Sequence, residues 1–169
     1  MHRDGGYADF LALPSENFLP IPDNLDYEGA AIAADAVNTP WHCMRERAQI
    51  NPHDDVMLVG AGGGVGIHGV QVAKIFGARV IAVDITEEKL ELASKWGADE
   101  VVNFRAIEDL AAEAKRLTAG KGVDAAIDFV GKPETFQACI DGLAVGGRAV
   151  VIGAQPGDVK VNPVNLVIT

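Results

Sequence analysis

The sequence predicts an α/β fold whose parallel sheet is doubly wound, with helices on both faces. From residue 55 onward, short apolar runs alternate with helical patterns, which is typical of repeated βαβ units. The apolar runs are rich in Val, Ile and Ala and lack polar alternation, as expected for strands that are covered on both faces. The chain has 169 residues, of which 49% are hydrophobic, so it is long enough for one domain with its own core.

Five of these apolar runs are expected to be the strands of the sheet. They lie at residues 55–60, 78–84, 100–104, 123–130 and 147–153. The helix after the first strand carries Gly66, Val70 and Ala73 on its inner face, at spacings of four and three. The second helix is expected to begin with Thr86 as its cap and to end at Gly97.

Two further helices are predicted from apolar stripes between the later strands. The third helix has the stripe Ile107, Leu110, Ala111, Ala114 and Leu117, and the fourth has the stripe Phe136, Cys139, Ile140 and Leu143. Pro133 lies near the first turn of the fourth helix, where proline is well tolerated.

The first fifty residues do not show this alternation. Residues 5–25 contain glycines, three prolines and scattered apolar side chains, and they are predicted to form short extended pieces and turns. The helical pattern that follows is expected to be two helices that meet at residues 38–40, because Pro40 disfavours the α conformation in the residue before it.

The composition excludes several classes of protein. The formal net charge of -10 disfavours a nucleic-acid partner, because phosphate binding needs a basic face. No uncharged apolar run approaches the roughly 20 residues that span a bilayer, and the first ten residues lack the apolar core of a signal peptide. We therefore expect a cytoplasmic protein with no membrane partner. Cys43 and Cys139 lack metal-ligand spacing and are expected to be buried free thiols.

The most informative stretch is VGAGGGVGIHG, residues 59–69. It places four glycines within five residues, after a predicted strand and before a predicted helix. At a helix N-terminus, backbone N–H groups without helical partners and the positive end of the macrodipole attract a pyrophosphate. Glycines let the phosphates approach the backbone, and Gly66 lets the helix pack closely on the sheet. The pattern therefore predicts a dinucleotide site.

Asp84 supports the same prediction. It ends the second predicted strand, 18 residues after Gly66, where a dinucleotide site needs an acceptor for the adenosine ribose hydroxyls. A carboxylate at that position repels the additional phosphate of NADP, so NAD is favoured. Each feature has a simpler explanation by itself: Asp84 would cap the next helix, and the glycines would form a tight turn. Their occurrence together in one βαβ unit favours the cofactor.

Five stretches carry a resemblance to a known family. They are GGYADF, LPIPDNLDYEGAA, VGAGGGVGIHGVQVAKIFGARVIAVDITEEKLELASKWGADEVVNF, GKGVDAAIDFVG and GGRAVVIG. In them the chain resembles the medium-chain dehydrogenase/reductase superfamily, and within it the zinc-dependent alcohol dehydrogenases. The resemblance implies a Rossmann domain preceded by a short remnant of a second, GroES-like catalytic domain. The glycine motif departs slightly from G-x-G-x-x-G, with Ala61, Gly63 and Gly66 at its three positions.

The resemblance also implies which residues bind the cofactor. They are Gly62, Gly63, Gly64, Val65, Gly66, Asp84, Lys89, Phe129, Val130, Ile152 and Gly153. Asp84 and Lys89 would hold the adenosine ribose, whereas Ile152 and Gly153 would meet the nicotinamide carboxamide through the backbone. The alternative for Lys89 is a solvated position on its helix, and the alternative for the apolar members is ordinary core packing.

Asp35 and Thr39 occupy positions that the resemblance connects with catalysis. Zinc-dependent members have a threonine at the position of Thr39, and a cysteine four residues before it is a ligand of the catalytic metal. Asp35 takes the position of that cysteine here. Asp35 is therefore a candidate zinc ligand in the complete enzyme, or else a residue that hydrogen-bonds locally or contacts the substrate. Thr39 would lie beside the nicotinamide, or else cap the helix after Pro40.

The resemblance further implies that the chain is part of a longer enzyme. Residues 1–28 correspond to the end of the catalytic domain and a linker, and residues 29–169 to the NAD-binding domain. The upstream zinc ligands, the proton relay and the sixth strand of the family are expected to be missing. We expect an unpaired edge on the fifth strand, which would lead to a homodimer or to cover by a chain tail.

Three functions remain open from the sequence. The first is the NAD-binding domain of an alcohol dehydrogenase. The complete enzyme would transfer hydride between an alcohol or carbonyl substrate and the nicotinamide, and zinc, if used at all, would be bound only by the complete enzyme. The chain alone would then bind NAD(H) without turnover. The second is a zinc-independent quinone or enoyl reductase domain that uses NAD(P)H, against which Asp84 counts. The third is a non-catalytic nucleotide-binding module.

Overall fold

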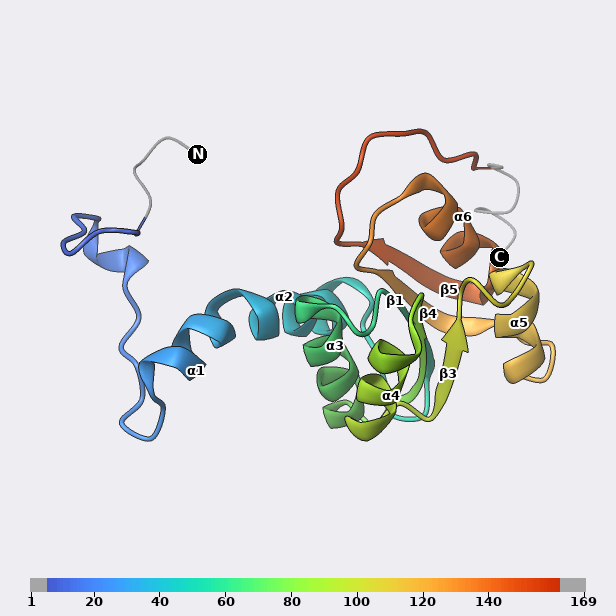
Figure 1. The fold of residues 1–169 in the computed structure, drawn as a ribbon, viewed down its shortest axis with the longest axis horizontal. Coiled ribbons are helices and arrows are strands. Elements are labelled where there is room, and N and C mark those ends of the chain that lie inside the picture. The colour runs from blue at the N-terminus through green and yellow to red at the C-terminus, as the bar shows by residue number, and fades with distance from the viewer. Residues whose placement is uncertain (1–5, 162–169) are drawn as a thin grey trace.

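The structure is a computed structural model that describes residues 6–161. Its centre is a five-stranded sheet in which all strands are parallel, in the order β3-β2-β1-β4-β5 (Figure 1). The strands are β1 Asp55–Val59, β2 Arg79–Asp84, β3 Glu100–Asn103, β4 Val123–Asp128 and β5 Leu143–Val151. The predicted doubly wound parallel sheet is confirmed, and the strand order reverses between β1 and β4.

Helices cover both faces of the sheet. They are α3 Gly64–Ile75, α4 Glu87–Lys95, α5 Leu110–Leu117 and α6 Pro133–Asp141. α3 and α4 pack on one face, and α5 and α6 on the other. In β1, Val56 and Leu58 belong to the core under α3, whereas Met57 and Val59 belong to the core under α5 and α6. None of the helices within residues 6–161 is long and apolar enough to cross a membrane.

The ends and faces of α3 and α4 follow the predicted signals with one exception. Gly66, Val70 and Ala73 are buried on the inner face of α3. Gly97 follows α4 with a φ of 108°, a conformation that suits glycine after a helix. Thr86 occupies the N-cap position of α4, but its side chain makes no capping hydrogen bond, contrary to the expectation.

Two apolar positions lie outside the helices predicted for them. Leu143 begins β5 instead of ending a helix, because α6 stops at Asp141. Ile107 precedes α5, because the side chain of Asp109 caps that helix by accepting a hydrogen bond from the N–H of Ala112 (3.0 Å). Both apolar side chains still pack against the core under α5 and α6. The stripes therefore identified the buried contacts better than they identified the helix ends.

The prediction that Pro40 separates two helices is wrong. The segment consists of α1 Tyr27–Ile32, a π-helical turn Ala33–Val37, α2 Asn38–His42 and a second π-helical turn Cys43–Arg47, without a break. The wider π turn before Pro40 accommodates the proline ring and its missing N–H within one helical path. Met44 of this segment is buried and joins the core under α3.

The N-terminal arm, residues 6–26, extends away from the sheet (Figure 1). It contains one short 3-10 turn, Ser15–Asn17, and nearly all of its residues are exposed. Tyr7, Phe10 and Leu19 expose large apolar side chains to solvent. The arm therefore contributes little to the core, and the domain boundary after residue 28 stays a prediction.

Cys43 and Cys139 are buried free thiols, as predicted. Burial raises the pKa of Cys43 to about 12. Burial and, to a smaller extent, the carboxylate of Asp128 raise the pKa of Cys139. Neither thiol is ionised near neutral pH, so neither has the thiolate character of a reactive cysteine.

The strand β5 has one sheet neighbour, β4, among residues 6–161. After Val151 the chain leaves the sheet and passes α6, where the N–H of Lys160 donates a hydrogen bond to Oε1 of Gln137 (3.0 Å). The last residues of the sequence lie outside the described part. A homodimer through the edge of β5 stays a prediction.

Charged side chains gather at the amino edge of the sheet. Asp124 of β4 accepts hydrogen bonds from the N–H of Asp55 (2.9 Å) and from Nζ of Lys121 (2.7 Å). Burial raises the pKa of Asp124, but these hydrogen bonds outweigh it and hold that pKa below its ordinary value of 3.8. A carboxylate with a lowered pKa stabilises the fold above its ordinary pKa, and the contribution disappears as the pH falls through the lowered value.

Asp124→Asn is expected to lower the free energy of unfolding by up to about 1 kcal/mol at neutral pH, because the ion pair with Lys121 is lost. Urea unfolding of both proteins across a pH series should show that this difference shrinks below pH 3.8. Glu91→Gln removes an exposed carboxylate on α4 and should leave the stability unchanged. A difference for Asp124→Asn that stays constant in acid would contradict the assignment.

Candidate functional site

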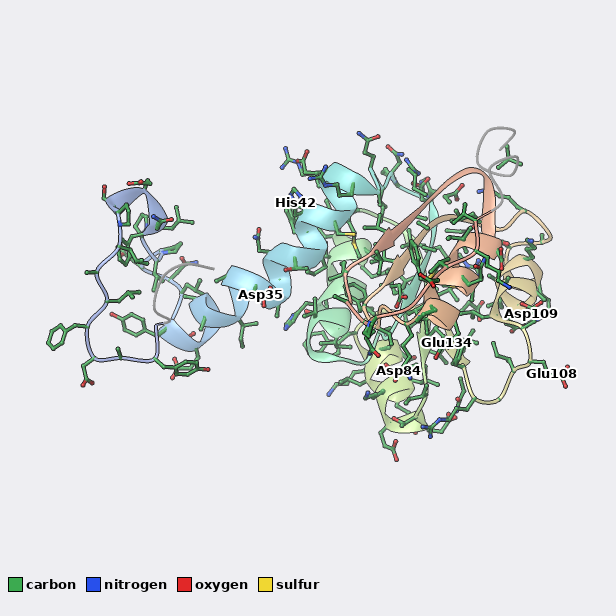
Figure 2. All side chains as sticks on the ribbon, turned by 90° about the horizontal axis from the view of Figure 1, so that it is seen from above. Asp35, His42, Asp84, Glu108, Asp109 and Glu134 are labelled. Atoms are coloured by element: carbon green, nitrogen blue, oxygen red, sulfur yellow. The ribbon has the colours of Figure 1, made fainter. Side chains whose placement is uncertain are left out.

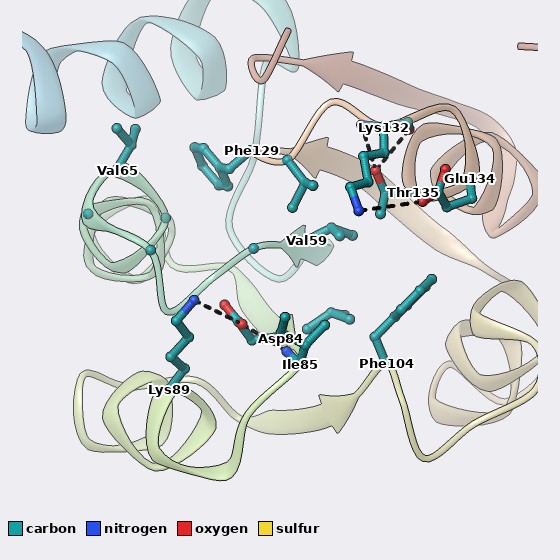
Figure 3. Close-up of a pocket in the computed structure, with 16 residues that line it drawn as sticks. Val59, Val65, Asp84, Ile85, Lys89, Phe104, Phe129, Lys132, Glu134 and Thr135 are labelled. Carbon is teal, nitrogen blue, oxygen red and sulfur yellow. Dashed lines mark hydrogen bonds and ion pairs between the residues drawn. The ribbon is translucent and has the colours of Figure 1, made fainter. Parts of the chain in front are cut away.

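The reversal of strand order creates a cavity at the carboxyl edge of the sheet. In a doubly wound sheet the helices on either side of the reversal diverge, so a crevice opens beyond the ends of the two strands. Here the cavity has a volume of about 480 Å³ and is lined from the ends of β1, β2 and β4 and from the first turn of α3 (Figure 3). The predicted glycine loop and Asp84 both lie at this edge.

Three glycines of the loop are required by the packing of the chain itself. Gly60 has a φ of 80°, and a Cβ atom there would lie 2.8 Å from Cγ2 of Val130. A Cβ on Gly62 would overlap the side chain of Lys89, and a Cβ on Gly66 would overlap the carbonyl oxygen of Gly60. These glycines therefore let α3 and α4 approach the turn, and they do not by themselves indicate a ligand.

Gly64 differs from Gly60, Gly62 and Gly66 because the packing of the chain does not require a glycine at this position. A Cβ atom added to Gly64 would have no heavy atom within 4 Å, and the residue lines the cavity. It is the first residue of α3, and within residues 6–161 no hydrogen bond is made by the N–H groups of Gly64, Val65 and Gly66. Three unpaired N–H groups at the positive end of a helix form a seat for an anion, and a side chain at residue 64 would narrow it.

The carboxylate of Asp84 is buried and aimed at the glycine loop. Its Oδ2 accepts a hydrogen bond from the N–H of Gly62 (2.9 Å), and its Oδ1 accepts one from the N–H of Ile85 (2.8 Å). Nζ of Lys89 lies 3.5 Å from Oδ1, and the lysine side chain is half-exposed whereas Asp84 is 5% exposed. Asp84 thus ties the end of β2 to the loop, and it retains lone pairs toward the cavity.

Two of the predicted apolar residues line the other end of the cavity. Phe129 and Val130 follow β4, and Figure 3 shows Phe129 near Val65, away from Asp84. Phe129 also packs against α3, since a Cβ on Gly69 would lie 2.7 Å from its Cζ. These side chains therefore pack against the core and also form a wall of the cavity, and their role in cofactor binding stays a prediction.

Ile152 and Gly153 lie next to this wall without lining the cavity itself. Their N–H groups both donate to the carbonyl oxygen of Asp128, at 2.8 Å and 3.1 Å. Gly153 lies against Gly131. A Cβ on Gly131 would overlap the backbone of Gly153, and a Cβ on Gly153 would overlap the backbone of Val130. The segments after β4 and β5 are thus in direct backbone contact.

Asp35 lies on the helical segment beside the sheet domain (Figure 2). Thr39 lies on α2 of the same segment, and neither residue lines the cavity. The hydroxyl of Thr39 donates a hydrogen bond to Oδ1 of Asp35 (2.8 Å), so Asp35 does hydrogen-bond locally. No three His, Cys, Asp or Glu side chains are grouped so as to hold a metal ion anywhere in the described part of the chain. A catalytic zinc takes three protein ligands, so these residues do not by themselves fit one.

The prediction of cofactor-binding residues omitted eight residues that line the cavity. Val59, Gly60 and Val83 lie at or next to the ends of β1 and β2, and the others are Ile85, Phe104, Lys132, Glu134 and Thr135. Ile85 and Phe104 could have been found, because Ile85 follows directly on one predicted strand, Phe104 ends another, and parallel strands end at one edge. Lys132, Glu134 and Thr135 come from the start of α6, and their place depends on how that helix crosses the sheet.

Comparison with known proteins identifies the family. The family model for zinc-binding dehydrogenases matches residues 64–169, which is more than half of the chain. The NAD-dependent alcohol dehydrogenase of Sulfurisphaera tokodaii is 36% identical over 162 residues, which cover 95% of this chain and 46% of that protein. The chain therefore spans about half the length of the curated relatives that it matches.

Solved structures give the same result. The alcohol dehydrogenase of Aeropyrum pernix has a TM-score of 0.85 at 34% identity, covering 97% of this chain and 48% of that one. A quinone oxidoreductase of Pseudomonas syringae pv. Tomato DC3000 has a TM-score of 0.81 at 32% identity, covering 91% and 47%. The chain belongs to the zinc-binding dehydrogenase family, within the medium-chain dehydrogenase/reductase superfamily, and comprises its coenzyme-binding domain.

Proposed function

We propose that this chain binds NAD(H) in the cavity at the carboxyl edge of its sheet. The observation that carries the proposal is the first turn of α3, where three N–H groups are unpaired within residues 6–161 and Gly64 leaves open space. The pyrophosphate would accept hydrogen bonds from these groups and would be stabilised by the helix dipole. Packing within the protein does not account for a glycine at residue 64, whereas a phosphate close to the backbone does.

Asp84 and Lys89 would hold the adenosine ribose. The carboxylate of Asp84 is buried beside the glycine loop and can accept hydrogen bonds from the ribose hydroxyls in addition to those from the backbone. A phosphate on the ribose would meet this negative charge in a setting with little water to screen it. Lys89 offsets part of the charge, and its half-exposed ammonium group can reach a ribose hydroxyl from the solvent side. NAD is therefore favoured over NADP.

The nicotinamide would lie between Val65 and the residues after β4. Phe129 and Val130 form an apolar wall there, which would exclude water from one face of the ring. Ile152 and Gly153 would turn backbone groups toward the carboxamide. When bound, the nicotinamide supplies a carbon that accepts or returns a hydride. Thr39 would approach from the helical segment, with its hydroxyl oriented by Asp35.

In a longer protein this domain would support an NAD-dependent alcohol dehydrogenase acting on a small alcohol or carbonyl compound. The alcohol dehydrogenases among the relatives and the carboxylate at residue 84 support this function. A zinc ligand role for Asp35 would require donors from outside the described residues. The second candidate is a zinc-independent quinone or enoyl reductase, which is supported by the similarity to a quinone oxidoreductase.

Gly64→Ala is expected to leave the stability of the fold within about 1 kcal/mol of the original protein, since the new methyl group meets no protein atom. The same substitution should weaken NADH binding roughly tenfold or more, because the methyl group occupies the space proposed for a phosphate. Calorimetric titration with NADH and thermal unfolding measure the two effects separately. Unchanged affinity in the folded variant would contradict the proposed phosphate seat.

Gly66→Ala is the matched comparison within the same turn. Its Cβ would overlap the carbonyl oxygen of Gly60, so we expect a loss of at least about 2 kcal/mol in the free energy of unfolding. Thermal unfolding without any ligand measures this loss. A stable Gly66→Ala protein would show that α3 does not depend on close contact with the turn.

Asp84→Asn tests the choice between the two nucleotides. The original protein should bind NADH at least about tenfold more tightly than NADPH, and removal of the charge should bring the two affinities closer together. Glu91→Gln, which removes an exposed carboxylate of α4 that does not line the cavity, should preserve the ratio. Tighter binding of NADPH by the original protein would overturn the NAD preference and favour the quinone or enoyl reductase.

A further inference from the structure

A buried carboxylate lies directly behind the proposed nicotinamide end of the cavity. Asp128 is the last residue of β4 and is 0% exposed. Its Oδ1 accepts hydrogen bonds from the N–H groups of Val130 (2.8 Å) and Gly131 (3.0 Å), and its Oδ2 accepts one from Oγ1 of Thr135 (2.7 Å). None of the ion pairs within residues 6–161 includes this carboxylate.

Burial of such a carboxylate costs free energy, so we expect its hydrogen bonds to have a role that an apolar residue could not fill. A carboxylate without a cation loses its hydration on burial, and hydrogen-bond donors must replace that hydration. The three donors around Asp128 are all neutral, and two of them are backbone groups of the turn that follows it. The carboxylate therefore determines the course of that turn.

The backbone of Asp128 acts on a second segment. Its carbonyl oxygen accepts hydrogen bonds from the N–H groups of Ile152 and Gly153, the two residues that follow β5. Gly131 has a φ of 73° and touches Gly153 so closely that neither position has room for a side chain. One residue thus connects the turn after β4, the start of α6 and the segment after β5.

We propose that Asp128 is a positioning residue for the nicotinamide half of the binding site. By holding the N–H groups of residues 130 and 131, it would keep Phe129 and Val130 as a fixed wall of the cavity and Ile152 at the correct distance from the carboxamide. The proposal rests on the proposed NAD(H) site. It does not involve contact between Asp128 and the cofactor, and the adenosine half at Asp84 does not depend on it.

Asp128→Asn tests this role, because asparagine keeps the shape of the side chain and one acceptor oxygen but removes the charge. Two ligands are titrated by calorimetry: NADH, and ADP-ribose, which lacks the nicotinamide. NADH affinity should fall roughly tenfold, whereas ADP-ribose affinity should stay within about twofold. The emission of bound NADH should also shift toward that of free NADH, because the ring would be less shielded from water.

Two matched controls separate positioning from general destabilisation. Asp124→Asn removes a carboxylate from the other end of the same strand and should leave the ratio of the NADH and ADP-ribose affinities unchanged. Thr135→Val removes the hydrogen bond to Oδ2 of Asp128 and should reduce NADH affinity more than ADP-ribose affinity, whereas Thr135→Ser retains the hydroxyl and should restore most of the NADH affinity that Thr135→Val loses. The Thr135 pair decides the question if Asp128→Asn does not fold.

Two results would overturn the positioning role. Equal weakening of both ligands in Asp128→Asn would show a loss of folded protein, and unchanged NADH binding in the folded variant would show that the turn does not need the charge. If Asp128→Asn does not fold, Thr135→Val and Thr135→Ser proteins with the same NADH affinity would have the same consequence. Failure of the proposed function looks different, because the original protein would then bind neither ligand.

Discussion

The close approach of α3 to the turn after β1 is the contact on which the site depends. Gly66 lies against the carbonyl oxygen of Gly60 with no room for a side chain, so the first turn of α3 is held over the end of β1. This contact places residues 64–66, the first turn of α3, at the cavity. The reversal of strand order between β1 and β4 then leaves space in front of them. The helix start and the crevice are therefore two results of one packing arrangement.

Much of this arrangement could be predicted from local sequence. The alternation of apolar runs and helical stripes predicted the five strands, because strands buried on both faces need apolar residues without interruption. The glycine cluster and Asp84 were also recognisable, since backbone approach and a carboxylate at a strand end are requirements that only a few residue types meet. The structure places Gly64 and Asp84 around one cavity, together with Lys89 and Phe129, which only the family resemblance implied.

Other parts depend on contacts between distant segments and have no local signal. Asp128 resembles any acidic residue at the end of a strand, and its importance appears only when the turn after β4 and the segment after β5 are seen to meet. Lys132 and Thr135 line the cavity only because α6 crosses the sheet at a particular place. The error at Pro40 has a different origin, since local rules treat proline as a helix breaker and take no account of a π turn that accommodates it.

The two buried cysteines make it possible to measure when each helix layer detaches from the sheet. Cys43 lies in the core under α3, and Cys139 lies in the core under α5 and α6, on opposite faces of the sheet. Each sulfur is shielded by its own layer, and its raised pKa keeps it in the unreactive thiol form. An alkylating reagent would therefore modify each one only while its own layer is detached. The rates at which the two thiols are alkylated would show whether the two helix layers detach together or one after the other.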